Sequence, residues 1–201
     1  MRFFSVFAPL ALAIVAFASP LANPEPVPDT NDLAVRNSCN SCRPLPAIIV
    51  DVTVQVTPHV NYLKSLSAKD CTAEKVKPSI IEIKGIIEGA IVEVKALAGV
   101  SLDIVLSTSG GILGLVDLCN LIVTLYTLIF GCFSAVLSVV VSVEYGAVVG
   151  LLVEVGVLLG SLLNLILSIV GGLFILVKTL LVVILPTVNQ IGCKESFSYL
   201  Y

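Results

Sequence analysis

The sequence predicts an all-α protein, a bundle of about four to six helices that ends in two long, highly apolar helices. Two observations predict this class. Apolar residues recur at intervals of three and four over most of the chain, which is the repeat of a helix. In the C-terminal half the few polar residues recur at the same interval, although Val and Ile there locally favour a sheet. The 201 residues suffice for one domain with its own core.

Residues 1–18 have the pattern of a secretory signal peptide. One arginine precedes an apolar run, and Ala16 and Ala18 stand at positions minus three and minus one of a cleavage site. A first transmembrane helix would need about 20 apolar residues, and Pro9 and Pro20 leave fewer than that. We therefore expect an exported protein.

Residues 19–45 form a Pro-rich arm with a CxxC motif. Its stretch "SPLANPEPVPDTND" holds four prolines, which predict an extended, solvated linker. An even number of cysteines in an exported chain favours disulfides. The candidates are Cys39, Cys42, Cys71, Cys119, Cys132 and Cys193. Cys119 and Cys132 lie about 20 Å apart along one continuous helix, so we expect no bond between them.

Residues 46–201 are expected to form a single helical domain whose first half, residues 46–111, is amphipathic. The piece from Pro46 to Leu66 alternates locally as a strand would, but its apolar spacing also fits a helix interrupted by Pro58, and we choose a kinked helix. Apolar residues then recur at three and four between Asp70 and Ala98, which predicts an amphipathic helix.

Two local signals indicate a helix start and a break within this half. Ser79 and Glu82 have the spacing of a capping box directly after Pro78, which would restart the helix there. The sequence "TSGG", Thr108 to Gly111, marks a break before the apolar half.

Residues 112–190 form the apolar half and carry only four charged side chains, against nineteen in residues 1–111. Two polar stripes follow a helical repeat within it. The first comprises Asp117, Asn120, Thr124, Thr127, Gly131, Ser134, Ser138 and Ser142, and the second comprises Glu154, Ser161, Asn164, Ser168, Gly171 and Lys178. They could face water on a globular bundle, or face one another in a membrane bundle.

Helix length and charge bear on this alternative. The stretches Ile112–Val143 and Ala147–Leu185 would reach about 48 and 58 Å as helices, against about 30 Å of membrane hydrocarbon. Glu154 would be costly in lipid. A break at Gly171 and Gly172 would give spans of acceptable length, so a membrane protein remains the rival interpretation. Four GxxxG spacings, which begin at Gly85, Gly110, Gly146 and Gly156, are weak signals of close helix packing or of chance.

We find no catalytic residues, and we predict no enzyme, cofactor or metal site. His59 is the only histidine and has no evident catalytic partner, and no zinc, nucleophile-elbow, P-loop or Rossmann spacing occurs. Glu144 and Glu154 lie ten apart and would pair only by accident of packing. A net charge of -3 gives no basic footprint for nucleic acid.

The parts described above follow one another in a recognisable order. A signal and a Pro-rich arm precede "CNSCRPLPAIIVDVT", the amphipathic "IIEIKGIIEGAIVEVKALAG" and an apolar, Gly-punctuated half that ends near "LPTVNQIGC". This order resembles that of small secreted proteins of mushroom-forming fungi, one of which is associated with aerial hyphae and attachment alongside hydrophobins. Hydrophobins themselves have eight cysteines with two adjacent pairs, whereas this chain has six and no adjacent pair.

The resemblance implies a role at the cell wall or hyphal surface and gives no site residues. Together with the lengthwise separation of charge, it predicts a secreted structural or surface-active protein that supports aerial growth or attachment. Expected partners are the cell wall or a hydrophobic interface, with possible self-association or lipid binding. An integral membrane protein of the secretory pathway and a secreted lipid-binding carrier are the alternatives.

Overall fold

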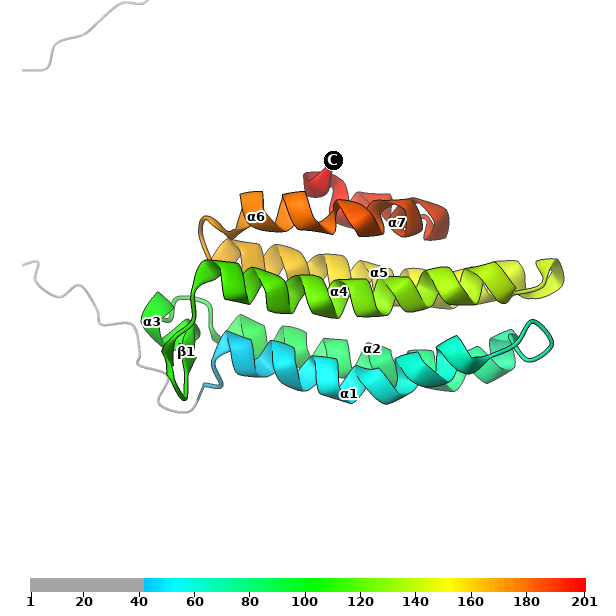
Figure 1. Cartoon of the computed structure of the whole chain (residues 1–201), viewed down its shortest axis with the longest axis horizontal. Helices are drawn as coiled ribbons and strands as arrows, with labels where there is room; N and C mark the ends of the chain where they lie inside the picture. Colours follow the sequence, from blue (N-terminus) through cyan, green and yellow to red (C-terminus); the bar gives the residue numbers. More distant parts are fainter. Residues whose placement is uncertain (1–41) are drawn as a thin grey trace, which may run out of the picture. The chain divides into compact units, whose positions relative to one another are not determined.

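The computed structural model describes residues 42–201, which form helices over most of their length (Figure 1). The signal peptide expected over residues 1–18 and the arm up to residue 41, with Cys39, lie outside the described residues. The elements are α1 (Leu45–Ser65), α2 (Ala73–Ala96), α3 (Leu102–Val105), β1 (Ser107–Thr108), β2 (Gly111–Ile112), α4 (Leu115–Val139), α5 (Ser142–Ile169), α6 (Leu173–Leu180), the 3-10 helix η1 (Leu181–Ile184), α7 (Leu185–Ile191) and the 3-10 helix η2 (Lys194–Leu200). The predicted all-α class is confirmed.

Helix α1 is the helix expected from the apolar spacing near the start of the domain. Pro44 is its N-cap residue, and Pro46 lies in the first turn, where a missing backbone N–H costs no intrahelical bond. Pro58 lies inside α1 and does not end it. The buried residues keep the helical repeat that predicted the element: Leu45, Pro46, Ile48, Ile49, Val52, Val56, Val60 and Leu63.

Helix α2 is the amphipathic helix expected between Asp70 and Ala98. Thr72 is the N-cap residue, and its hydroxyl accepts a hydrogen bond from a backbone N–H of the first turn. The capping box expected at Ser79 and Glu82 is wrong, because Ser79 is buried inside the helix, which runs through Pro78. The fully buried Val76 lies in the turn that precedes Pro78, so packing against the core favours the longer helix.

The connection between the two halves of the chain is a short helix and a small hairpin. Helix α3 precedes strand β1, which pairs antiparallel with β2 through Ser107 with Ile112 and Thr108 with Gly111. The break expected at Thr108–Gly111 is confirmed, although no strand was expected there.

The polar stripes lie on the outside of α4 and α5. Their exposed members are Asp117, Asn120, Thr124, Gly131, Ser134 and Ser138 on α4, and Ser142, Glu154, Ser161, Asn164 and Ser168 on α5. Hydroxyl groups on this face bond to their own helix, as Ser161 Oγ does to the Val157 carbonyl at 3.0 Å. Within residues 42–201 the stripes therefore face outward and do not meet one another inside the bundle.

The last long helix expected from the sequence is broken. Helix α5 ends at Ile169, and Gly171 and Gly172 separate it from α6. Gly172 has a φ of 83°, in the left-handed region that a residue with a Cβ rarely adopts. The single helix expected from Ala147 to Leu185 is therefore wrong, whereas the break considered at these two glycines is present.

The helices of residues 42–201 lie in three layers (Figure 1). The first layer is α1 with α2, the second is α4 with α5, and the third is the segment from α6 to η2, residues 173–201, which we name the C-terminal layer. Helix α2 packs against α5 and α1 packs against α4, whereas the C-terminal layer packs on the other side of α4 and α5. Helices α4 and α5 meet each other in only a few places.

Aromatic side chains fill the space between α4 and the C-terminal layer. The Phe197 ring is fully buried, with its centroid 5.6 Å from that of Phe130 and 6.5 Å from that of Tyr126, both on α4. The edge-to-face geometry of these pairs is the one that aromatic quadrupoles favour. The Tyr126 hydroxyl also donates to the Leu159 carbonyl at 2.7 Å and so links α4 to α5.

Four of the cysteines are free and buried, namely Cys71, Cys119, Cys132 and Cys193. Helix α4 carries both Cys119 and Cys132 without interruption, and the two are not bonded to each other, as expected. The structure thus contains no disulfide among these four residues. None of these four is bonded to Cys42.

Three helical stretches of the described residues are long and apolar enough to cross a membrane by length and composition. They are Leu115–Val139, Ser142–Ile169 and Leu173–Ile191, of which the third includes the 3-10 segment η1.

Candidate functional site

The C-terminal layer exposes several large apolar side chains. Five of them lie within ten consecutive residues: Phe174, Ile175, Leu180, Val182 and Val183, with exposed fractions of 40, 72, 45, 56 and 67%. We name this set the C-terminal apolar face. Scattered apolar residues are normal on any protein surface, but a group of this kind is typical of an interaction site.

The C-terminal apolar face exists because residues 173–191 are apolar almost all round. Their inner side chains are already used for packing against α4 and α5: Leu173, Val177, Leu181, Ile184, Val188 and Ile191 are buried. A helix with one apolar stripe would present polar residues on its other side. Here the outer side chains are apolar too, so folding leaves them in contact with solvent.

One charged side chain accompanies this face. Lys178 is half-buried, and its Nζ lies 5.8 Å from the centre of the Phe174 ring. The same Nζ lies 3.5 Å from the carbonyl oxygen of Tyr201, so the ammonium group folds back towards the protein. The stem of a lysine can cover apolar surface while its charged end stays hydrated. Lys178 thus interrupts the apolar character of the face very little.

The ion pairs of residues 42–201 all include a residue of the first layer or of the segments leading into it. Arg43 pairs with Asp51 and Glu93, Lys75 pairs with Asp70, and Lys84 pairs with Glu154 on α5. Within residues 42–201 the C-terminal layer therefore takes part in no ion pair, whereas exposed large apolar side chains occur on both the first layer and the C-terminal layer.

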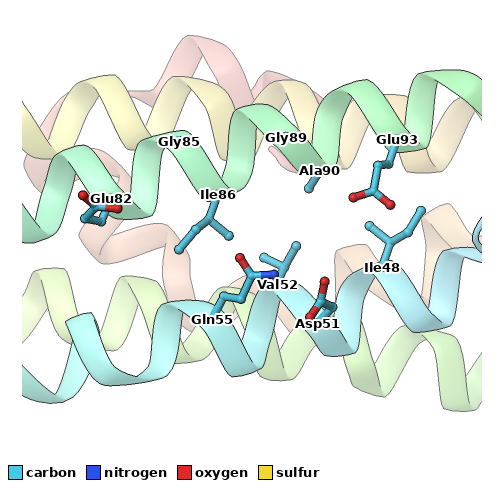
Figure 2. Close-up of a pocket in the computed structure, with 10 residues that line it drawn as sticks. All are labelled: Ile48, Asp51, Val52, Gln55, Glu82, Gly85, Ile86, Gly89, Ala90 and Glu93. Carbon is cyan, nitrogen blue, oxygen red and sulfur yellow. The ribbon is translucent and has the colours of Figure 1, made fainter.

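A groove of about 290 Å³ runs between α1 and α2 (Figure 2). Its lining is Ile48, Asp51, Val52 and Gln55 from α1, and Glu82, Gly85, Ile86, Gly89, Ala90 and Glu93 from α2. The two glycines contribute no side chain to it, which leaves the groove open beside Ile86 (Figure 2). It combines an apolar floor with carboxylates.

The carboxylates at one end of this groove already have a partner. Arg43 Nη2 lies 3.0 Å from Asp51 Oδ2, and Arg43 Nη1 lies 3.2 Å from Glu93 Oε2. A hydrogen bond with Gln55, and then the one with Arg43, lowers the pKa of Asp51. Arg43 thus joins the beginning of α1 to the end of α2, and we assign these groups a structural role.

The remaining titratable residues that the sequence analysis considered are apart from one another. His59 is half-buried on α1 and lines a hollow together with Glu74, Lys77 and Glu82. Glu144 accepts a hydrogen bond from the Ala73 backbone N–H at 2.9 Å, whereas Glu154 pairs with Lys84 at 2.8 Å. Among residues 42–201 no group of three or more His, Cys, Asp or Glu side chains could hold a metal ion.

The GxxxG spacing from Gly156 to Gly160 marks a close packing contact. A Cβ added at Gly156 would lie 2.9 Å from Cys193 Sγ, and one added at Gly160 would lie 2.6 Å from the Ser196 carbonyl oxygen. These glycines therefore allow the C-terminal layer to approach the backbone of α5. The spacing itself was the available signal, but it does not say which segment makes the approach.

Comparison of the chain with protein-family models, with curated proteins and with solved structures finds no match.

Proposed function

We propose that this protein is a secreted structural or surface-active protein of the fungal cell wall or hyphal surface, which binds an apolar interface through the C-terminal apolar face. The observation that carries the proposal is the run of five exposed large apolar side chains within ten residues of a layer that takes part in no ion pair among residues 42–201. A protein of this kind orients at an interface, because one side loses contact with water and the other keeps it.

The energy available from such orientation is considerable. Complete burial of a Val, Leu, Ile or Phe side chain is worth about 1.5–3 kcal/mol relative to full exposure. The five side chains of the C-terminal apolar face are 40 to 72% exposed, so each still has on the order of 1 kcal/mol to gain. Together they favour contact with an apolar surface by several kcal/mol.

The cellular setting rests on the sequence. The signal pattern of residues 1–18 supports secretion, and the resemblance to small secreted proteins of mushroom-forming fungi supports the wall or hyphal surface as the destination. Fractionation of the culture into medium, wall and membranes, with N-terminal sequencing of the recovered protein, tests both. Recovery of an intact Met1 would contradict the secretion argument.

Adsorption at an air–water surface is the direct test of the proposed activity. We compare the full chain with the variant Ile175→Gln/Val182→Gln/Val183→Gln, whose altered residues are exposed and so outside the core. A matched control is Val54→Gln/Ile81→Gln/Val92→Gln on α1 and α2, where the replaced side chains are 65, 52 and 67% exposed.

The wild-type protein and the control should lower surface tension at concentrations where an ordinary globular domain does not, and the first variant should do so much less. Equal effects of the two triple variants would show that general hydrophobicity, and not the C-terminal apolar face, drives adsorption. A folded, monomeric wild-type protein without any effect on surface tension would reject the function itself.

An integral membrane protein is the second candidate, because three stretches of the described residues are long and apolar enough to span a bilayer. Against it, Asn120 and Ser134 on α4 and Asn164 on α5 are exposed, where a membrane would place lipid. Carbonate extraction separates the two candidates: a spanning protein stays in the membrane pellet, whereas a surface protein is released.

A further inference from the structure

The C-terminal layer contacts α5 backbone to backbone. Ser196 lies against Gly160 and Cys193 against Gly156, both within distances that leave no room for a Cβ on α5. The fully buried Phe197 lies between these two contacts and the aromatic rings of α4. The layer therefore fills the space that α4 and α5, which meet in few places, leave between them.

Few polar interactions hold the C-terminal layer in place. Among residues 42–201, one side-chain hydrogen bond, from the Tyr199 hydroxyl to the Gly160 carbonyl at 3.1 Å, and no ion pair join it to the other helices. The boundary between α2 and α5 has both an ion pair, Lys84 with Glu154, and the bond from Ala73 N–H to the Glu144 carboxylate.

This difference decides which boundary opens at an apolar surface. Hydrophobic burial against α4 and α5 can be replaced by burial against a hydrocarbon phase, since the interaction is non-directional. An ion pair or a directed hydrogen bond has no substitute there. The C-terminal layer is thus held almost entirely by interactions that such a surface can replace, whereas the first layer also has an ion pair and a directed hydrogen bond to α5.

We propose that the C-terminal layer is a lid, which turns about Gly171 and Gly172 and separates from α4 and α5 when the protein meets an apolar surface. Opening adds the side chains under the lid, Tyr126 and Phe130 among them, to the surface that the C-terminal apolar face already contacts. The hinge has the required freedom, because both glycines are exposed and a Cβ at Gly171 would meet nothing within 4 Å. This inference rests on the proposed function and specifies how it is regulated.

The free thiol of Cys193 allows the lid to be locked. In Gly156→Cys the new Cβ would lie 3.3 Å from Cys193 Cβ and 2.9 Å from its Sγ, close to the about 3.5–4.5 Å that the Cβ atoms of a disulfide span. Oxidation with diamide should bond α5 to the lid in the full chain. A matched control is Gly150→Cys on the same helix, which is exposed and has nothing within 4 Å of the new Cβ.

The experiment measures the rate of adsorption at a dodecane–water interface for each protein before and after reduction. Oxidised Gly156→Cys should adsorb at least fivefold more slowly than its reduced form, whereas wild type and Gly150→Cys should be insensitive to reduction. Mass spectrometry after digestion verifies the bond to Cys193. Equal rates for the locked and reduced protein would overturn the lid, and so would failure of the bond to form.

Hydrogen exchange of residues 185–201 distinguishes failure of the lid from failure of the proposed function. Their exchange should increase at least tenfold when wild-type protein is bound to dodecane droplets, and the locked variant should stay protected. If the protein adsorbs and these residues stay protected, the lid is wrong and the surface activity stands. If the protein does not adsorb, the proposed function fails, and the lid fails with it.

Discussion

Replacement of Gly160 by Ala isolates the contact between α5 and the C-terminal layer. The added Cβ would lie 2.6 Å from the Ser196 carbonyl oxygen and 2.7 Å from Ser196 Cβ. The first neighbour is backbone, so no rotamer change can relieve the overlap and the C-terminal layer must shift. Overpacking of this kind costs about 1–3 kcal/mol, whereas Ala gains about 1 kcal/mol over Gly inside a helix.

The matched variant Gly150→Ala separates these two contributions. Gly150 lies on the same helix, and a Cβ there meets nothing within 4 Å, so only the gain in helix propensity remains. The two variants should differ in free energy of unfolding by about 1–3 kcal/mol, or by about 3 °C or more in Tm for a chain of this size. Thermal and urea unfolding followed by circular dichroism measure the difference. Equal stability of the two variants would refute the close contact at Gly160, and with it the position of the C-terminal layer.

Two further predictions concern the stripe and the buried thiols. Ser161→Leu should change the free energy of unfolding in urea by no more than about 0.5 kcal/mol, because Ser161 is exposed on α5; a loss of 1–3 kcal/mol would mean that another helix covers this face. Burial raises the pKa of Cys193 to about 11 and that of Cys132 to about 12, whereas a thiol in the unfolded chain has a pKa of about 9. Each protonated thiol therefore stabilises the fold fully below about pH 9, and this stabilisation is lost as the pH rises through 11 to 12. Tm should therefore hold to about pH 9 and fall above it, and a constant Tm up to pH 12 would contradict the burial of these thiols.

The first layer was predictable because its signal is local. Val76, Ile80, Ile83, Ile87 and Val94 repeat at helical intervals in the sequence, and all five are buried in α2. The restart of the same helix that was expected at Ser79 was wrong. A capping-box spacing after a proline is a local signal, and it does not show whether the preceding turn packs in the core, as Val76 does.

The C-terminal layer was not predictable, for two different reasons. The polar repeat continues from Ser168 to Lys178 across the break, so periodicity conceals the end of α5, and only Gly171 and Gly172 signal it. The contact between Gly160 and Ser196 joins residues that are 36 positions apart. The local sequence around each residue does not predict which distant residue it contacts.

Charged residues are concentrated in the first half of the chain, and the order of the helices places that half in one layer of the structure. Helices α1 and α2 pair with each other, whereas α4 and α5 pack chiefly on α1 and α2, so the charged half of the chain forms the first layer and the apolar half forms the other two. The C-terminal layer comes last and packs on the side of α4 and α5 that α1 and α2 leave free. An apolar segment therefore covers one side of the bundle without being covered itself. A further layer of helices would bury this segment in an ordinary core. Among residues 42–201 no such layer is present, so the segment leaves an apolar surface that can bind an apolar interface.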